Sequence, residues 1–426
     1  MNYIRRNLLS IIGRRLLKDP VIVLTGSRQT GKTTLAKYQL PEKTAQQAAY
    51  ISFDDPDERL RFQKSAVAIL ESFVEPLIIL DEVQKIPALF DPLKLIVDRQ
   101  NELKSGARKK FVLTGSSQLL LMKNIRETLA GRVALFNLYP FSISEIIESL
   151  DNYSMSRIWS KGYVEAKEIK QFDYLAPDKT RKVVMLKNEH RAWGGYPPVW
   201  QKKDTADKIN WLRDYRKTYL ERDISDVGQV ANIDNFALAQ KLFCARTAGI
   251  LSISEVARDL SLAVNTVKRY LSLLSMTFQC FLLPPYYENV SKRLIKSPKI
   301  YFPDAGLNRA ILGDVNISEG AAYESWIFSE LLKWKQLQPV EPELYYFRTA
   351  GGLEIDFLLV GNGMILPIEV KSSGKVTSAD GRSLELFLKD HRKSSKIGLI
   401  VYPGTEFFEI RKNIWAVPDW YLFSGI

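Results

Sequence analysis

The segment Gly26-Ser27-Arg28-Gln29-Thr30-Gly31-Lys32-Thr33 decides the fold of the first third of the chain, because it fits the pattern G-x-x-x-x-G-K-[S/T]. It follows an aliphatic run, Val21–Leu24, and precedes a helix-like stretch, Thr34–Tyr38. A strand, a glycine-rich loop and a helix in this order are the context in which the pattern binds phosphate. The alternative is a glycine-rich turn without a ligand. The residues expected to contact the ligand are Gly26, Ser27, Arg28, Gln29, Thr30, Gly31, Lys32, Thr33 and Thr34.

Each part of this loop has an expected chemical role. Gly26 and Gly31 carry no Cβ, so backbone N–H groups can converge on phosphate oxygens. The N-terminus of the following helix adds the positive end of its dipole. Lys32 is placed to neutralise the β- and γ-phosphates, and Thr33 to ligate Mg²⁺. The pattern therefore predicts a ligand with β- and γ-phosphates, bound together with Mg²⁺.

A second hydrophobic run, Pro76–Leu80, ends in two carboxylates, Asp81 and Glu82. A buried strand that ends in two acids places them at the edge of an open α/β sheet where ligands bind. We expect Asp81 to hold Mg²⁺ with Thr33, and Glu82 to orient and deprotonate the attacking water. The alternative is an exposed acidic strand end.

Two further positions are candidates for catalysis. The run Phe111–Leu113 leads into a Thr-Gly-Ser turn, in which Thr114 or Ser116 can hydrogen-bond the attacking water or the γ-phosphate. Arg132 precedes the next aliphatic run and is a candidate arginine finger for the nucleotide of a neighbouring subunit, with Arg126 as the competing choice. An intramolecular salt bridge or a sensor role in cis remains the alternative for Arg132. An arginine supplied in trans would require at least a transient homo-oligomer.

These motifs resemble the AAA-type ATPase domain of a large archaeal and bacterial group of predicted ATPases that carry a C-terminal domain of unknown function. The resemblance rests on the phosphate-binding loop, the Asp81-Glu82 strand, the Thr114 turn and Leu129-Ala-Gly-Arg132. Later stretches extend it over almost the whole chain: Tyr219–Asp223, Lys292–Lys299 and Phe347–Thr349. The resemblance implies ATP binding and hydrolysis with Mg²⁺, and it does not imply a biological process.

The pattern of aliphatic runs and helical stretches divides the chain into four regions. Aliphatic runs separated by helix-length segments indicate the buried strands of a parallel sheet. The expected fold class is α/β: a P-loop NTPase sheet domain, then helical and winged-helix segments, and a C-terminal restriction-endonuclease-like α/β domain. The expected regions are an ATPase domain at 1–140, a helical lid or linker at 141–245, a winged helix-turn-helix at 246–300 and an endonuclease-like domain at 301–426.

The third region reads as a helix-turn-helix. Ser252 or Ser254 can cap a first helix, and a second helix begins near Val264. Four polar residues project from the start of the second helix, where a recognition helix contacts DNA: Asn265, Thr266, Lys268 and Arg269. The alternative is a structural module that packs between domains or binds protein. Tyr286, Tyr287 and the basic pair Lys292-Arg293 are candidates for a wing, or for core and solvent-facing positions.

The fourth region resembles the metal-dependent nuclease core of restriction endonucleases and archaeal junction resolvases. Asp356 lies in one expected strand, and Glu369 and Lys371 share a face of the next. The resemblance implies that Asp356 and Glu369 bind Mg²⁺ and that Lys371 stabilises the nucleophile or the developing charge, with Glu324 as an upstream acid. The alternatives are an inactive scaffold and a solvated ion pair.

Composition narrows the remaining classes of function. The 426 residues include 60 Lys and Arg against 48 Asp and Glu, and the net charge of +12 is compatible with a polyanionic partner. Two cysteines and two histidines exclude a disulfide scaffold, a four-cysteine zinc site and a multi-histidine centre. No apolar run is long enough to cross a bilayer. The stretch Tyr3–Leu17 predicts an amphipathic helix, with a mitochondrial-type presequence as the alternative, and a reducing cytoplasm is the expected compartment.

Together these observations predict a Mg²⁺-dependent ATPase whose nucleotide state is coupled to a helix-turn-helix and a nuclease-like domain that act on DNA. The rival is a nucleotide-gated binding switch, of the regulatory, defence or toxin–antitoxin type, with an inactive nuclease-like scaffold. The expected partners are ATP, DNA and further copies of the chain, and no membrane.

Overall fold

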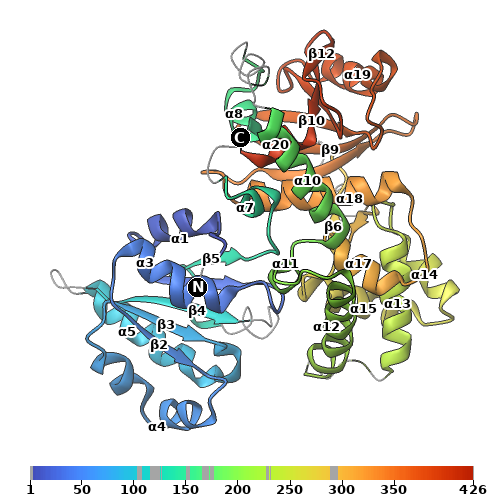
Figure 1. Ribbon diagram of the computed structural model, residues 1–426. Helices are drawn as coiled ribbons and strands as arrows, with labels where there is room; N and C mark the ends of the chain where they lie inside the picture. The colour runs from blue at the N-terminus through green and yellow to red at the C-terminus, as the bar shows by residue number, and fades with distance from the viewer. Residues whose placement is uncertain are drawn as a thin grey trace. The chain divides into compact units, whose positions relative to one another are not determined.

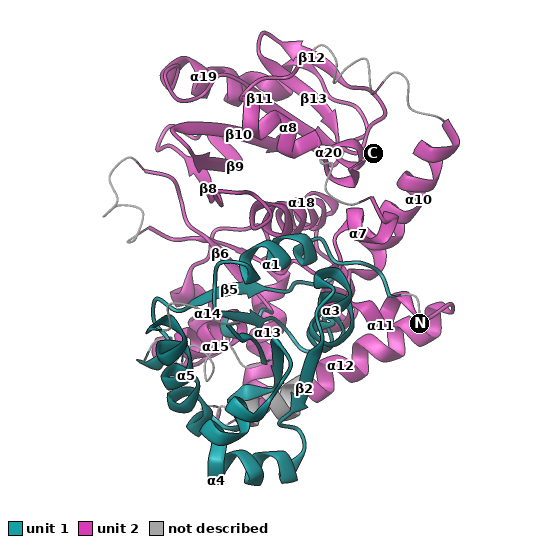
Figure 2. Cartoon of the chain, turned by 90° about the vertical axis from the view of Figure 1, so that its left-hand side faces the viewer, with its two compact units in different colours: residues 1–140, 276–278 teal, residues 141–275, 279–426 magenta. Residues whose placement is uncertain are grey.

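The computed structural model describes residues 3–102, 108–115, 125, 127–149, 154–165, 172, 177–226, 230, 232–287 and 296–425, with the side chains of 219–226 excepted. These residues form two compact units (Figures 1 and 2). Unit 1 is Met1–Pro140 with Met276–Phe278, and unit 2 is Phe141–Ser275 with Gln279–Ile426. Ser116 and Arg126, two candidates from the sequence, lie outside the described residues.

Unit 1 contains a sheet of five parallel strands in the order β2-β3-β4-β1-β5. The strands are β1 (Val21–Thr25), β2 (Ala48–Ser52), β3 (Leu77–Asp81), β4 (Lys110–Gly115) and β5 (Val133–Asn137). The aliphatic runs Val21–Leu24, Pro76–Leu80 and Phe111–Leu113 overlap β1, β3 and β4, and the predicted parallel sheet is confirmed. Because β4 pairs with both β1 and β3, the carboxyl end of β4, with Thr114, lies between the ends of β1 and β3.

Helices cover both faces of this sheet (Figure 1). They are α1 (Leu8–Leu16), α2 (Lys32–Thr34), a π-helical turn η1 (Leu35–Gln39), α3 (Leu40–Thr44), α4 (Pro56–Ser72), the 3₁₀ turns η2 (Val83–Lys85) and η3 (Pro87–Leu89), and α5 (Phe90–Glu102). Helices α4 and α5 bury Phe62, Leu70 and Ile96 against the strand residues Val23 and Ile78. The predicted amphipathic N-terminal helix is present as α1, which buries four aliphatic side chains.

Unit 2 begins with helices and contains a short antiparallel pair of strands. The helices are α7 (Ile143–Ile147), α8 (Ser154–Lys161), α10 (Pro177–Trp193), α11 (Pro197–Trp200), α12 (Thr205–Asp226), α13 (Ile233–Ala245), α14 (Ile253–Asp259), α15 (Val264–Met276), α17 (Ala305–Leu312) and α18 (Glu319–Lys335). The pair is β6 (Phe281–Leu283) with β7 (Lys299–Tyr301). One hydrophobic core joins α11 to α15 with α17.

The rest of unit 2 is a mixed sheet in the order β12-β13-β11-β10-β9-β8. Its strands are β8 (Glu343–Arg348), β9 (Glu354–Gly361), β10 (Met364–Val370), β11 (Gly398–Tyr402), β12 (Phe408–Arg411) and β13 (Ile414–Pro418), with the 3₁₀ turn η4 (Ser378–Gly381) and the helices α19 (Arg382–Asp390) and α20 (Asp419–Ser424). Strand β9 is antiparallel to both of its neighbours, β8 and β10, and β10, β11 and β13 are parallel. Helix α19 lies beside this sheet (Figure 2), and its residues Leu384 and Phe387 are buried in the same hydrophobic core as Ile355, Leu358 and Ile400 of the strands.

The hairpin region after β6 is joined to the edge of the six-stranded sheet. Pro285 forms a β-bridge with Tyr346 of β8, and the Tyr286 N–H donates to the Tyr346 carbonyl at 2.7 Å. Residues 285 and 286 thus extend the sheet at its β8 edge. As a result, β7 reaches the side of the sheet where β9 carries Asp356.

No helix in the described parts of the chain is both long and apolar enough to cross a membrane. The predicted boundaries after residues 140, 245 and 300 stay predictions.

Candidate functional site

The phosphate loop is shaped by two glycines with positive φ. Gly26 has φ +148° and Gly31 has φ +92°, a region that disfavours side chains. A Cβ built on Gly26 would lie 2.3 Å from the carbonyl oxygen of Leu138. Only glycine therefore lets the loop turn this close to the chain that follows β5.

Lys32 is buried and folded back onto the loop. Its ammonium group donates to the carbonyl oxygens of Gly26 at 2.9 Å and Ser27 at 2.8 Å. Thr30 also donates to the Ser27 carbonyl at 2.9 Å, and Arg6 donates to the Thr30 carbonyl at 2.7 Å. The positive charge of Lys32 is thus held inside the loop by neutral oxygens, which an anion in the loop would outcompete.

Asp81 accepts hydrogen bonds from three hydroxyl groups. Its Oδ2 accepts from Thr33 at 2.9 Å and from Tyr50 at 2.7 Å, and its Oδ1 accepts from Thr114. Thr33, Thr114 and Asp81, which were all expected at the site, therefore meet at the ends of adjoining elements. The sequence did not indicate Tyr50, a half-buried residue of β2, as a site residue.

Glu82 begins the turn after β3 in the left-handed region, with φ +58°. A non-glycine residue in this conformation is uncommon, and it often marks a functional position. Its carboxylate accepts a hydrogen bond from the side-chain amide of Gln84. The side chain is therefore oriented by a local partner at the sheet edge that carries Asp81.

Arg132 is engaged within its own unit. Its guanidinium binds Asp98 of α5 through Nε at 2.5 Å from Oδ1 and through Nη2 at 3.1 Å from Oδ2. This two-point ion pair is the intramolecular alternative that the sequence left open. A finger role in another subunit would require this ion pair to break.

Thr33 and Asp81 fit a Mg²⁺ ion, and the loop fits a triphosphate. Hydroxyl and carboxylate oxygens are ligands of the kind that Mg²⁺ prefers, and they lie within hydrogen-bond distance of each other here. Lys32 and the loop N–H groups supply the positive surroundings for phosphate.

The start of α15 exposes the residues predicted to contact DNA. Asn265, Lys268 and Arg269 are exposed, Thr266 is partly buried, and Val267 lies in the core. Ser252 caps α14 by accepting from the Glu255 N–H. Within the described chain, the side chains of Asn265, Lys268 and Arg269 make no hydrogen bond or ion pair. Of the candidate wing residues, Lys292 and Arg293 fall in a stretch that is not described.

The four nuclease-like candidates converge on one end of β9 and β10. Asp356 Oδ2 accepts from the Val370 N–H at 2.8 Å, where the β9–β10 ladder ends. Lys371 donates to Glu369 Oε1 at 2.8 Å. Asp356, Glu369 and Glu324 of α18 act on one another electrostatically, so they form one cluster.

Lys299 of β7 occupies the middle of this cluster, and the sequence did not indicate it as a site residue. Its ammonium lies 2.8 Å from Glu354, 3.2 Å from Glu324 and 3.6 Å from Asp356, and its side chain is 4% exposed. Tyr301, also on β7, donates to Glu324 at 2.5 Å. Two alternate residues of one short strand thus enter the carboxylate cluster from the hairpin side.

The burial of these carboxylates changes their protonation. Burial, with the charge of Asp356 beside it, raises the pKa of Glu324 to about 7 and that of Glu369 to about 8. Burial also raises the pKa of Asp356. The carboxylates raise the pKa of Lys299 despite its burial, so the lysine stays charged. Among the described residues, no three acidic, histidine or cysteine side chains are arranged to hold a metal ion.

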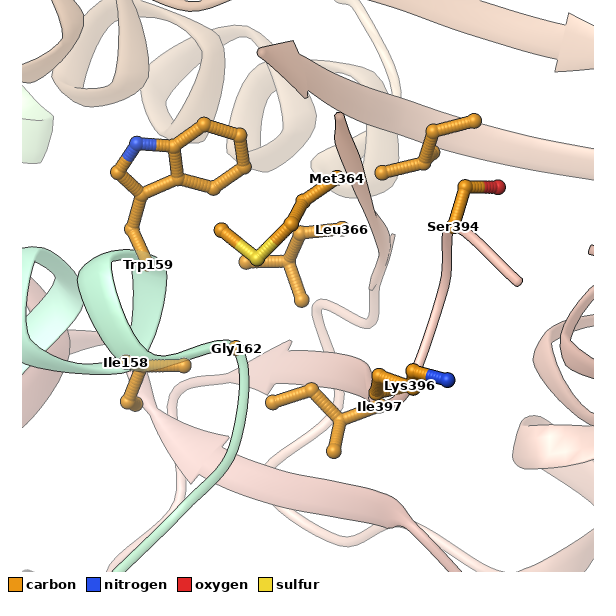
Figure 3. A pocket seen from close by; sticks show the side chains of 9 residues that line it. Ile158, Trp159, Gly162, Met364, Leu366, Ser394, Lys396 and Ile397 are labelled. Carbon is orange, nitrogen blue, oxygen red and sulfur yellow. The ribbon is translucent and has the colours of Figure 1, made fainter. Parts of the chain in front are cut away.

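A small apolar pocket lies between α8 and the β10 side of the sheet (Figure 3). It is lined by Trp159 and Ile158 on one side and by Met364 and Ile397 on the other, and its volume is about 20 Å³. A cavity of that size holds about one water molecule, so it is not a ligand site.

Three protein families match consecutive parts of the chain. Residues 18–147 match a family described as AAA domain, 187–317 match a domain of unknown function, and 319–422 match a second domain of unknown function. The N-terminal unit is therefore an AAA-type domain with a P-loop NTPase sheet, followed by helices and a mixed-sheet domain. This confirms the predicted resemblance to AAA-type ATPases that continue into domains of unknown function.

Relatives extend over nearly the whole chain. An uncharacterized protein of Mycobacterium tuberculosis is 29% identical over 429 residues, which cover 99% of this chain and 85% of that protein. An uncharacterized protein of Methanocaldococcus jannaschii is 24% identical, covering 95% of this chain and 88% of that protein.

Solved structures match at low similarity. The replication initiator DnaA bound to AMPPCP and single-stranded DNA is 16% identical, with a TM-score of 0.26, covering 64% of this chain and 90% of that one. The Thermotoga maritima RuvB Holliday junction branch migration motor is 18% identical, with a TM-score of 0.27, covering 65% and 86%. At these scores neither structure supports a functional argument.

Proposed function

We propose that the protein is a Mg²⁺-dependent ATPase. The observation that carries the proposal is the hydrogen bond of Thr33 to Asp81 at 2.9 Å, directly beside a loop that buries Lys32. This arrangement brings the hydroxyl and the carboxylate expected to set Mg²⁺ next to the group expected to bind phosphate.

In the proposed mechanism each residue of unit 1 has one task. The loop N–H groups and Lys32 bind the phosphates, and Thr33 and Asp81 would hold a Mg²⁺ ion, which would supply positive charge beside the phosphates. Glu82 orients the water and takes its proton. Thr114, hydrogen-bonded to Asp81, lies on the strand between the loop and Asp81, where its hydroxyl can also reach the water or γ-phosphate.

Phosphate release by the Glu82→Gln protein tests this proposal. The amide cannot accept the proton, so we expect ATP binding to persist and turnover to fall by about 10²–10⁴-fold. Glu42→Gln is the matched control, because Glu42 is exposed on α3 and its side chain makes no hydrogen bond or ion pair with the described residues. Equal hydrolysis by Glu82→Gln and the unaltered protein would contradict the assignment of the base.

We further propose that the helix-turn-helix brings this ATPase to DNA. The supporting observation is the exposed group of Asn265, Lys268 and Arg269 at the start of α15, with no partner in the described chain. Groups of this kind at a recognition-helix start contact bases and phosphates. Replacing both Lys268 and Arg269 by Ala should weaken binding of a labelled duplex at low salt and reduce the salt dependence. An unchanged affinity, alongside a Lys64→Ala control on α4, would contradict this proposal.

One observation favours the binding switch over a nuclease for the C-terminal domain. Lys299 pairs with Glu324, Glu354 and Asp356 and thereby occupies the space that a metal ion would need. We therefore propose that this domain does not cut DNA in the described conformation. Incubation with branched and linear DNA plus Mg²⁺ or Mn²⁺ should yield no products, while DNA binding persists. Cleavage that disappears in Lys371→Ala would establish the nuclease instead.

A further inference from the structure

A second hollow in unit 2 lies far in sequence from the phosphate loop and is large enough to hold a small molecule. Its volume is about 700 Å³, within the range typical of small-molecule sites. The walls come from α10, from α17 with the residues that follow it, and from the start of α18. The 141–425 part of the chain supplies all of them, so the hollow is independent of the proposed ATPase site.

Two arginines line the hollow, and each is stacked on an aromatic ring. The guanidinium of Arg309 lies 4.7 Å from the ring centre of Trp193, and that of Arg191 lies 4.7 Å from the ring centre of Tyr323. Stacking fixes the plane of a guanidinium and leaves its N–H edge available for a bidentate oxyanion. The two arginines are thus oriented before any ligand arrives.

The base of this arrangement is rigid. A Cβ on Gly306 would lie 2.1 Å from the carbonyl oxygen of Trp193, so α17 packs directly on the end of α10. This contact places Arg309, one turn further along α17, beside the Trp193 ring. Trp326 in the opposite wall donates to His190 at 2.9 Å. A pocket with preset walls loses less entropy when a ligand binds.

The charge of the lining selects an anion. The lining contains two arginines and one carboxylate, that of Glu319. Glu319 is paired with Arg191, and its side chain is 70% exposed. Within the described residues Arg309 has no acidic partner. An anion can therefore bind Arg309 without displacing an acidic side chain. At Arg191 it competes with the exposed carboxylate of Glu319.

The apolar side of the hollow is supplied by the aliphatic residues Leu312, Val315 and Ile317, and the lining also includes Asn188, Asn308 and Asn316. A group of this kind covers the organic part of a ligand, while the arginines bind its charged end. We propose that this hollow, the Arg191–Arg309 pocket, binds a small organic phosphate monoester, whose dianion matches two guanidinium groups and whose body contacts the apolar side.

The test is calorimetry on the full-length Lys32→Ala protein, in which the phosphate loop is disabled. The probes are phenyl phosphate, inorganic phosphate, benzoate and phenol. We expect phenyl phosphate to bind more tightly than inorganic phosphate or benzoate, and phenol not to bind. Tighter binding of benzoate than of phenyl phosphate would overturn the phosphate assignment.

Substitutions in the lining test whether phenyl phosphate binds in the Arg191–Arg309 pocket. Arg309→Ala should weaken phenyl phosphate binding by about tenfold, and Arg309→Lys should recover only part, because lysine lacks the planar fork. Glu319→Gln should tighten binding about threefold, since it removes the carboxylate that competes for Arg191. Arg392→Ala, an exposed arginine after α19, is the control and should change nothing. The proposal would be overturned if phenyl phosphate did not bind to the Lys32→Ala protein. It would also be overturned if adding Arg309→Ala to that protein left the affinity for phenyl phosphate unchanged.

The outcome of this test is independent of whether the protein is an ATPase. In the Lys32→Ala background a failure of phenyl phosphate to bind contradicts the pocket alone. A failure of the unaltered protein to bind ATP would contradict the proposed function alone.

Discussion

The phenol hydroxyl of Tyr50 donates a hydrogen bond to Asp81 Oδ2 at 2.7 Å, across the parallel pair of β2 and β3. The same oxygen accepts from Thr33 at 2.9 Å. The ammonium group of Lys37 lies over the Tyr50 ring, 4.2 Å from its centre, so a cation–π contact also holds the ring. Tyr50 thus fixes the carboxylate that is expected to set the metal ion.

Replacing Tyr50 by Phe removes this donor and keeps the ring. We expect the concentration of Mg²⁺ needed for half-saturation of ATP binding to rise about three- to tenfold, as for the loss of one hydrogen bond to a charged group. Binding of ATP without metal should not change, because the hydrogen bond that Tyr50 donates goes to Asp81 and not to the loop. Tyr38→Phe, at an exposed tyrosine nearby, serves as the control. An unchanged Mg²⁺ requirement would show that Asp81 is positioned without Tyr50.

Gly26 should tolerate no side chain. Gly26→Ala places a Cβ against the Leu138 carbonyl in addition to its unfavourable φ, so we expect a loss of about 2–4 kcal/mol in the stability of unit 1. Gly131→Ala is the matched control, because it has φ +77° but no atom within 4 Å of the added Cβ. Its expected loss is about 1–2 kcal/mol, the cost of the left-handed conformation alone. Differential scanning calorimetry measures both, and equal losses would contradict the close approach.

Lys299 should be required for the stability of unit 2. Lys299→Met leaves buried carboxylates without their cation, so we expect a loss of about 3–5 kcal/mol. All eight tryptophans of the chain lie between residues 159 and 420, and tryptophan fluorescence therefore reports the unfolding of unit 2 only. Lys296→Met, at an exposed lysine three residues earlier, should change stability little. A second change, Glu324→Gln, should restore part of the loss. Wild-type stability of Lys299→Met would refute the role of the lysine.

The carboxylate cluster also predicts a dependence on pH. Burial raises the pKa of Glu369 to about 8, above the ordinary value of a glutamate, so the folded state holds a proton that the unfolded chain has released. Its contribution is fully present at pH values below the ordinary pKa and is lost as the pH rises through 8. Glu369→Gln cannot lose a proton, so its stability should fall less than that of the unaltered protein between pH 6 and 9. Parallel urea-unfolding curves across this range would contradict the raised pKa.

The sequence predicted the strands of unit 1 because continuous aliphatic runs and a fixed loop pattern are local signals. Thr33, Asp81 and Thr114 follow from the same signals, since the carboxyl ends of parallel strands share one edge. Tyr50 could not be predicted, because its contact depends on β2 lying next to β3. That order is a property of the sheet, and no local pattern encodes it.

The C-terminal cluster illustrates the same limit. Asp356 and Glu369 lie on two consecutive strands and Lys371 directly follows the second, so their convergence could be read from the hairpin. Lys299 and Tyr301 precede them by more than fifty residues and arrive through the antiparallel pair of β6 and β7. Arg132 is a different case, because its sequence position left both a finger role and an ion pair open, and the pairing with Asp98 depends on where α5 packs.

The central claim is that unit 1 binds ATP with Mg²⁺ through Lys32 and the loop of residues 26–34. Calorimetric titration of ATP with Mg²⁺ into the unaltered protein and into Lys32→Ala tests it most directly. We expect the titration to give saturable heat of binding with the unaltered protein and none with Lys32→Ala, while circular dichroism shows that both proteins are folded. No heat from the unaltered, folded protein, or the same affinity in both, would contradict it.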